Sequence, residues 1–268
     1  MADLGWEMSR PKQTPLKALR RELPQGASLL LAVSGGIDSM SMLHGSMLIS
    51  KRKKLRLEVA HLDHGLRATS HVDADFVADQ AQAAGLPCHI KKALPPGRSE
   101  NVEAWGRRER YTFFAEVRAE RKLDWVVTAH TADDLAETLL MRLFSNKEPL
   151  GIEARDEQRR LLRPLLTVSR VQILEFAKAH KISYVEDETN LDLSLLRNRV
   201  RHVVMPLLRR EFDARMEETL AERAAALGSD ISFLYGLILE PIEEVAKNKF
   251  GSRVWLKLVR QKLKDLPY

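Results

Sequence analysis

Two short stretches of the sequence hold most of the side chains that could do chemistry. The first follows an apolar run and precedes an amphipathic one, and it consists of Ser34, Gly35, Gly36, Ile37, Asp38 and Ser39. Glycines let the main chain turn tightly, and amides at the start of a helix point toward negative charge. The two serine hydroxyls would add donors, and Asp38 could hold Mg²⁺ or a catalytic water. This stretch predicts a phosphate-binding turn without the Walker A lysine, with an ordinary glycine turn as the alternative.

The second stretch, residues 128–138, is predicted to begin a helix with an acidic face. Asp134 and Glu137 are three residues apart and therefore share one side of that helix. Two carboxylates could bind a metal, act as acid and base, or hold a cationic substrate; the alternative is an acidic helix start that complements the helix dipole. His130 just before them is a candidate phosphate contact or a proton acceptor near neutral pH.

Basic and imidazole side chains form a third group of candidates. His64 and Arg67 follow the second predicted strand and would reach toward nucleotide phosphates or the reacting base, unless the histidines there are structural. Arg107 and Arg110 share one face of a predicted helix, where they could position RNA or stabilise developing charge. The alternative is a solvated helix face with ion pairs, which we prefer for Arg108.

The pattern of elements between these groups predicts a doubly wound α/β fold with a mostly parallel sheet. Buried strands are expected at residues 28–33, 55–61, 87–91 and 125–128, and helices at 39–50, 72–84, 102–121 and 133–144. Ligands of such sheets bind at the carboxyl ends of the strands, where all the stretches above should lie. Residues 145–163 lack a clear period and are predicted to be a mobile loop that faces a substrate. Residues 187–190 are predicted to cap the next helix.

Two units are expected along the 268 residues. A catalytic α/β domain would cover residues 1–212, and the change to a polar stretch rich in alanine and leucine predicts a small C-terminal helical domain at 213–268. A basic segment at 247–264 with Trp255 at its centre would either bind RNA or pack on the core.

Composition limits the class of protein. The net charge of +6 and the pI near 9.4 favour an anionic partner, including nucleic acid. A single cysteine, Cys88, excludes an intramolecular disulfide and a site built on paired thiols. Neither a signal-peptide core nor a run of about 18 apolar residues is present, so a cytoplasmic protein away from membranes is expected.

The motifs in order resemble those of a known family. The turn at residues 34–39 resembles the PP-loop of ATP pyrophosphatases. The set SGGIDS, HLDHGLR, NVEAWGRRERY, HTADDLAET, RPLL, EDETN and RNRVRHVVMPLL resembles the tRNA(Ile)-lysidine synthases over about residues 29–208. That resemblance implies ATP, Mg²⁺, free L-lysine and tRNA(Ile) with a CAU anticodon. ATP would adenylate O2 of the wobble cytidine, and the lysine ε-amine would then attack carbon 2 and release AMP.

The resemblance also implies roles for individual residues. The turn at 34–39 would bind ATP and Mg²⁺, while Asp134 and Glu137 would bind lysine. Arginines at the family's positions would face tRNA, phosphates and the transition state; they are Arg107, Arg110, Arg197 and Arg201. We take the catalytic set to be Asp38, Arg107, Asp134, Glu137 and Arg197.

Three other functions and one assembly stay open. A tRNA thiolation enzyme on the same scaffold would need more cysteines than Cys88, and amide-forming synthetases would not explain the later motifs. A non-catalytic RNA-binding module would be favoured by loss of Asp38 or of the acidic pair, and all three residues are present. A homodimer is also open.

Overall fold

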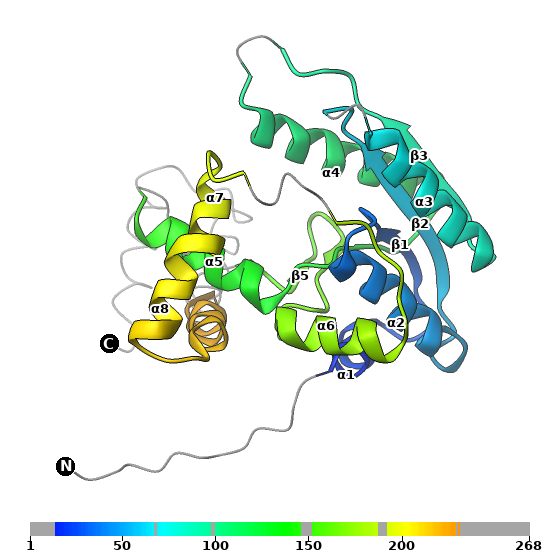
Figure 1. Cartoon of the computed structure of the whole chain (residues 1–268). Coiled ribbons are helices and arrows are strands. Elements are labelled where there is room, and N and C mark those ends of the chain that lie inside the picture. The colour runs from blue at the N-terminus through cyan, green and yellow to red at the C-terminus, as the bar shows by residue number, and fades with distance from the viewer. Residues whose placement is uncertain are drawn as a thin grey trace, which may run out of the picture.

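A computed structural model describes residues 14–66, 69–97, 100–145, 152–186, 192–228 and 230. Its centre is a sheet of strand order β3-β2-β1-β4-β6-β5 (Figure 1). The strands are β1 Ser28–Ala32, β2 Arg56–Asp63, β3 Cys88–Lys92, β4 Trp125–Val127, β5 Arg155–Asp156 and β6 Leu161–Leu162. All neighbours are parallel except β5, which runs antiparallel to β6. The mostly parallel α/β fold predicted from the sequence is confirmed.

The strand order changes direction between β1 and β4, and this reversal marks the ligand site of the fold. From β1 the chain adds β2 and then β3 on one side, and it adds β4 and β6 on the other. Open α/β sheets bind ligands in the crevice beyond the carboxyl ends of the strands at such a reversal. The turn after β1 and the turn after β4 therefore flank this crevice.

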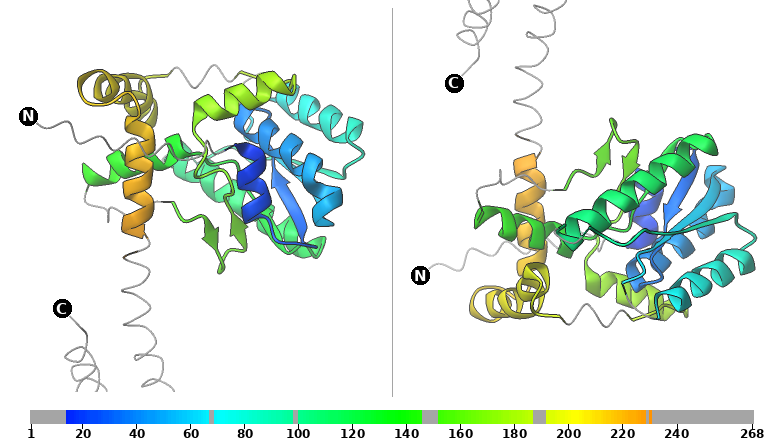
Figure 2. Two further views of the ribbon diagram at one scale, coloured as in Figure 1. Left: turned by 90° about the horizontal axis from the view of Figure 1, so that it is seen from below. Right: turned by 90° about the horizontal axis from the view of Figure 1, so that it is seen from above.

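Helices cover both faces of the sheet (Figures 1 and 2). One face carries α1 Pro15–Glu22, α2 Ile37–Lys53, α3 Ser70–Ala83 and α6 Arg170–Ala179, and the other carries α4 Val102–Glu120. Successive strand residues point to opposite faces, so Leu29 and Leu31 of β1 join the first core while Leu30 joins the second. Because both of its faces are buried, the central strand β1 is apolar along most of its length rather than alternating.

Helix α5 (Ala132–Leu143) begins at the sheet but packs elsewhere. Its apolar residues contact a group of helices that lie beside the sheet in Figure 1. These are α7 Leu196–Arg199, the π-turn η2 Val200–Val204, α8 Met205–Glu211 and the helical residues 216–228. Pro206 lacks an amide hydrogen and its ring crowds the carbonyl four residues earlier, which accounts for the wide π-turn just before it.

The predicted boundaries of the four main strands and helices agree with the structure to within a few residues. The loop predicted over 145–163 is wrong in part, because β5 and β6 form a hairpin there. Leu161 and Leu162 form β6 and are buried beside β4. A strand of this length is too short to leave a periodic pattern in the sequence. The predicted cap at 187–190 and the basic segment at 247–264 lie outside the described residues. Residues 216–228 are helical as expected, and a separate unit over 213–268 stays a prediction.

Within the described residues, no helix is both long enough and apolar enough to cross a bilayer.

A buried carboxylate, Glu58, ties β2 to its neighbours on the second face. Its side chain is 1% exposed and accepts hydrogen bonds from Arg121 Nε at 3.0 Å, His89 Nε2 at 2.8 Å and Arg56 Nη2 at 2.5 Å. Burial alone would raise the pKa of Glu58, but the hydrogen bonds from Arg121, His89 and Arg56 lower it to about 2. The ionised form is therefore strongly favoured in the folded protein.

Glu58 is expected to make the fold sensitive to acid. Its folded pKa lies below the unfolded value, so its contribution is complete above about pH 5 and is lost as the pH falls toward 2. Glu58→Gln should lower the free energy of unfolding by about 3 kcal/mol at pH 7, and the difference from the wild type should shrink at pH 3. Urea unfolding of both proteins at several pH values measures this. A difference that does not change with pH would contradict the prediction.

Candidate active site

The turn after β1 has the geometry of an anion-binding loop. Gly35 has a φ of +92°, a backbone conformation that residues with a side chain rarely adopt. Its carbonyl accepts a hydrogen bond from the amide of Val185 at 3.0 Å. Gly36 is the N-cap of α2, so Ile37 and Asp38 form the first turn of that helix. The first amides of a helix have no partner within the helix and are available to an anion.

Ser39 braces this turn from inside. Its Oγ donates to the carbonyl of Gly36 at 2.9 Å and accepts from the amide of Ser34 at 3.1 Å. The Oγ of Ser34 lies 3.2 Å from the same hydroxyl, and Ser34 as a residue is exposed. Ser39 therefore shapes the loop, while Ser34 is open to a ligand.

His61 fixes the end of β1. Its Nδ1 lies 2.9 Å from the carbonyl of Val33, the residue before the turn. Burial lowers the pKa of His61, so its ring is neutral and Nδ1–H donates this bond. His61 is thus engaged in a structural contact with the end of β1.

Asp38 is the carboxylate nearest the turn. Its Oδ2 accepts from Arg170 Nη1 at 2.5 Å, and its Oδ1 is buried without a hydrogen-bond partner among the described residues. Burial raises the pKa of Asp38 to about 6, although Arg170 acts in the opposite direction. A half-satisfied, desolvated carboxylate beside a phosphate-binding turn is suited to a cation that accompanies phosphates.

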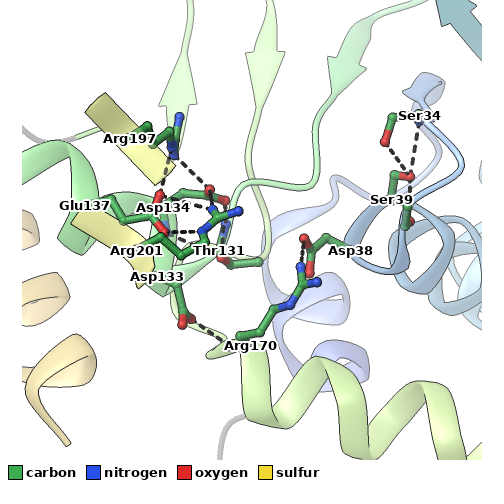
Figure 3. Close-up of polar contacts among 11 residues, drawn as sticks. Ser34, Asp38, Ser39, Thr131, Asp133, Asp134, Glu137, Arg170, Arg197 and Arg201 are labelled. Carbon is green, nitrogen blue, oxygen red and sulfur yellow. Dashed lines mark hydrogen bonds and ion pairs between the residues drawn. The ribbon is translucent and has the colours of Figure 1, made fainter. Parts of the chain in front are cut away.

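Asp134 and Glu137 contact two arginines directly (Figure 3). Arg197 donates to Glu137 Oε2 at 2.7 Å and to Asp134 Oδ1 at 2.8 Å. Arg201 donates to Glu137 Oε1 at 2.6 Å and also reaches Glu137 Oε2 at 3.1 Å and Asp134 Oδ1 at 3.4 Å. These four residues form what we call the acid–arginine cluster. The cluster joins α5 to α7 and η2, which lie about sixty residues further along the chain.

The two carboxylates of the cluster differ in how many hydrogen bonds they can still accept. Asp134 Oδ2 also accepts from the amide and hydroxyl of Thr131 in a capping box, so four donors already surround Asp134. Glu137 accepts three bonds and retains a place on Oε1. Burial would raise the pKa of Asp134, but Arg197 and its other partners hold it below the usual value. The contacts of Asp134 are thus compatible with both roles considered for it: a carboxylate that stabilises the start of a helix, and a carboxylate that acts in the site.

The imidazoles at the crevice are neutral. Burial and the Arg110 guanidinium lower the pKa of His64 to about 4. Arg110 Nη2 donates to His64 Nε2 at 3.4 Å, so the ring proton resides on Nδ1, which is buried without a partner among the described residues. Burial also lowers the pKa of His130, whose Nδ1 lies 2.9 Å from Thr128 Oγ1. Both nitrogens of His64 are therefore closed to a substrate. The pKa of about 4 makes His130 a weak base at neutral pH, so the predicted role as a proton acceptor near neutral pH does not fit, while a hydrogen bond to phosphate stays open.

The remaining predicted arginines are either exposed or outside the described residues. Arg107 is exposed and stacks over the Tyr111 ring at 5.1 Å, on the same helix as Arg110. Exposed Arg108 forms ion pairs with Glu100 and Glu109, as we preferred for it. Arg67 lies outside the described residues.

Sequence reasoning missed Arg170 and Asp133. Arg170 is the first residue of α6; its side chain contacts Asp38 and its amide donates to Asp133 Oδ2 at 2.7 Å. Burial raises the pKa of Asp133. Nothing in local spacing relates Arg170 to a carboxylate 132 residues earlier, because only the packing of α6 on α2 brings them together.

The donor set fits Mg²⁺ in one specific way. No group of three or more histidine, cysteine or acidic residues in the described part of the chain could hold a metal by itself. Mg²⁺ usually binds one or two carboxylates together with waters and substrate phosphates. Asp38, with an unpartnered oxygen beside the turn, fits that pattern.

Comparison with known proteins agrees with this geometry. The family model described as "PP-loop domain" matches residues 8–208, so the chain belongs to the PP-loop family, whose members use ATP. A tRNA(Ile)-lysidine synthase from Gloeobacter violaceus is 37% identical over 225 residues, covering 81% of this chain and 68% of that protein. One from Nostoc sp. is 33% identical over 254 residues, covering 89% and 73%. Within the PP-loop proteins, the chain belongs to the tRNA(Ile)-lysidine synthase family.

The length of the match differs among relatives, and a solved structure shares the fold. The chain spans about half the length of several curated relatives, for example 52% of the Lactobacillus gasseri tRNA(Ile)-lysidine synthase. The U34-tRNA thiolase NcsA from Methanococcus maripaludis matches with a TM-score of 0.67 at 15% identity, over 80% of this chain and 78% of that one. At that identity the likeness shows the fold alone.

Proposed function

We propose that this protein ligates lysine to carbon 2 of the wobble cytidine in the CAU anticodon of tRNA(Ile), using ATP and forming lysidine. The observation that carries the proposal is the placement of two sites at the strand-order reversal: the glycine-rich turn with Asp38, and the acid–arginine cluster. Family membership supports a reaction that uses both.

In the first half-reaction, O2 of the cytosine attacks the α-phosphorus of ATP and pyrophosphate leaves. The amides of the turn and the hydroxyl of Ser34 bind the phosphates. Asp38 and phosphate oxygens would hold Mg²⁺, which when bound neutralises charge on the leaving pyrophosphate. Arg107 and Arg110, with Arg67, contact the tRNA or its phosphates. Arg197 stabilises charge that develops in the transition state.

In the second half-reaction, the ε-amine of lysine attacks carbon 2, the bond from that carbon to the adenylated oxygen breaks, and AMP leaves. Glu137 and Asp134 attract the cationic substrate, and the remaining place on Glu137 Oε1 accepts an ammonium hydrogen. The same carboxylate takes the proton that the ε-ammonium loses to become the attacking amine. Arg201 fixes the two carboxylates for this role.

Incorporation of radiolabelled lysine into a tRNA(Ile) transcript tests the proposal directly. The expected result is ATP-dependent labelling together with release of AMP and pyrophosphate. A transcript with uridine in place of the wobble cytidine is the matched control and should remain unlabelled. Absence of labelling in the complete reaction would overturn the proposal.

Binding of the tRNA is expected to weaken as salt rises. A basic protein that contacts phosphates releases counterions, so between about 50 and about 200 mM salt the affinity should fall by at least about tenfold. Fluorescence anisotropy with a labelled transcript measures the slope. Arg107→Gln, at an exposed arginine, should reduce the slope of log affinity against log salt by about one. A flat response would indicate that the substrate is a small molecule.

A tRNA thiolation enzyme is the second candidate, favoured only by the shared fold with the thiolase structure. Cys88, the one cysteine of the sequence, is half-buried on β3. Burial raises the pKa of its thiol, so the reactive thiolate is disfavoured. We also propose a cytoplasmic enzyme, with a homodimer as an assembly that light scattering can test.

A further inference from the structure

Arg170 differs from the other arginines at the crevice in how it is held. Arg197 and Arg201 each contact both carboxylates of the acid–arginine cluster, and their side chains are 32% and 31% exposed. Within the described part of the chain, Arg170 makes a single ion pair, to Asp38, and its side chain is 44% exposed. Its guanidinium can therefore leave at little cost, since among the described residues one ion pair holds it and water is within reach.

Asp38 needs a positive partner whether or not a nucleotide is bound. A carboxylate whose Oδ1 is buried and unpartnered is unfavourable unless a nearby cation compensates its charge. In this structure the compensating cation is Arg170 on Oδ2 (Figure 3).

We propose that Arg170 is a displaceable counter-cation, a positioning residue that occupies Asp38 in the nucleotide-free protein and yields the carboxylate to the divalent cation that arrives with ATP. This inference rests on the proposed function of Asp38. Once displaced, the guanidinium remains at the first turn of α6 beside the phosphate-binding turn, where it attracts the nucleotide.

The main chain of Arg170 keeps its place during this exchange. Its amide donates to Asp133 Oδ2, and Ser169 and Gln172 form a capping box at the start of α6. None of these bonds uses the guanidinium, so a side-chain substitution at position 170 leaves them intact. The fold of such variants should persist, and circular dichroism can verify it.

Calorimetric titration with α,β-methylene ATP, without tRNA or lysine, tests the exchange separately from catalysis. For Arg170→Gln, the Mg²⁺ concentration that gives half-maximal binding of the analogue should fall by roughly threefold to fivefold, because the competing cation is gone. In EDTA, binding of the analogue should weaken by a similar factor, because a positive charge near the phosphates is lost.

Two controls separate this effect from general electrostatics. Arg170→Lys keeps a positive charge and should retain a Mg²⁺ requirement near that of the wild type. Lys51→Gln removes an exposed charge from the far end of α2 and should leave both titrations unchanged. An unchanged or higher Mg²⁺ requirement in Arg170→Gln would overturn the proposal. Because the assay needs no lysine or tRNA, a failure here is distinct from a failure to form lysidine.

Discussion

Replacing Glu137 with glutamine should raise the lysine concentration needed for half-maximal lysidine formation by at least about thirtyfold, because an ammonium group in a partly desolvated pocket loses its charged partner. Glu137 is 3% exposed and retains an acceptor place on Oε1. Adenylation of the tRNA should survive, since ATP contacts come from the turn after β1. Lysine titrations, with adenylate accumulation followed in parallel, measure both halves of the reaction.

Asp134→Asn is the matched control for this experiment. The four donors around Asp134 leave no place for a further hydrogen bond, so it should raise the lysine requirement less than Glu137→Gln does. Either variant also leaves Arg197 and Arg201 with one anionic partner in place of two, which should lower the free energy of unfolding. The double variant Glu137→Gln with Arg201→Gln should recover part of that stability without recovering lysine use. An unchanged lysine requirement in both single variants would show that the lysine pocket lies elsewhere.

Asp38→Asn should abolish ATP-dependent pyrophosphate release while making the fold more stable at neutral pH. The folded pKa of Asp38 is raised to about 6, so the ionised form is less favourable in the folded than in the unfolded chain. The contribution of Asp38 to the stability of the wild type therefore falls as the pH rises from about 4 to about 7, and the asparagine variant lacks this loss. Over that range the difference in unfolding free energy should widen by up to about 3 kcal/mol in favour of the variant.

Urea unfolding at pH 4, 5, 6 and 7 measures the stability, and a coupled pyrophosphate assay measures activity. Asp133→Asn is a useful comparison, because burial also raises the pKa of Asp133 but that residue lies outside the phosphate-binding turn. Near-normal pyrophosphate release by Asp38→Asn would exclude Asp38 from the reaction. A variant less stable than the wild type at pH 7 would show that the ion pair with Arg170 outweighs the cost of burial.

The parts of the site that could be predicted from the sequence are those built by neighbours in the chain. The turn after β1 depends on Gly35, Gly36 and the strand before them, and all lie within a few residues. The shared face of Asp134 and Glu137 follows from helical periodicity alone. In both cases local spacing determines the geometry, so the prediction needed no knowledge of the tertiary fold.

The rest depends on packing between distant segments. Asp134 looks like an open carboxylate in the sequence, yet Arg197 and Arg201 surround it because α7 and η2 pack on α5. Arg170 reaches Asp38 only through the contact of α6 with α2. The hairpin of β5 and β6 is too short for a periodic signal, and β6 is a strand because β4 offers it hydrogen bonds.

The π-turn η2 makes this part of the chain intolerant of a change in length. The amide of Met205 donates to the carbonyl of Val200, and both side chains pack with Ala136 and Leu140 of α5. In a regular α-helix, residues five apart point roughly 140° away from each other, so Val200 and Met205 could not share a face. Deleting one residue here would turn either the apolar side chains or Arg197 and Arg201 away from α5. Related sequences should therefore tolerate substitutions within this turn but should not contain insertions or deletions there.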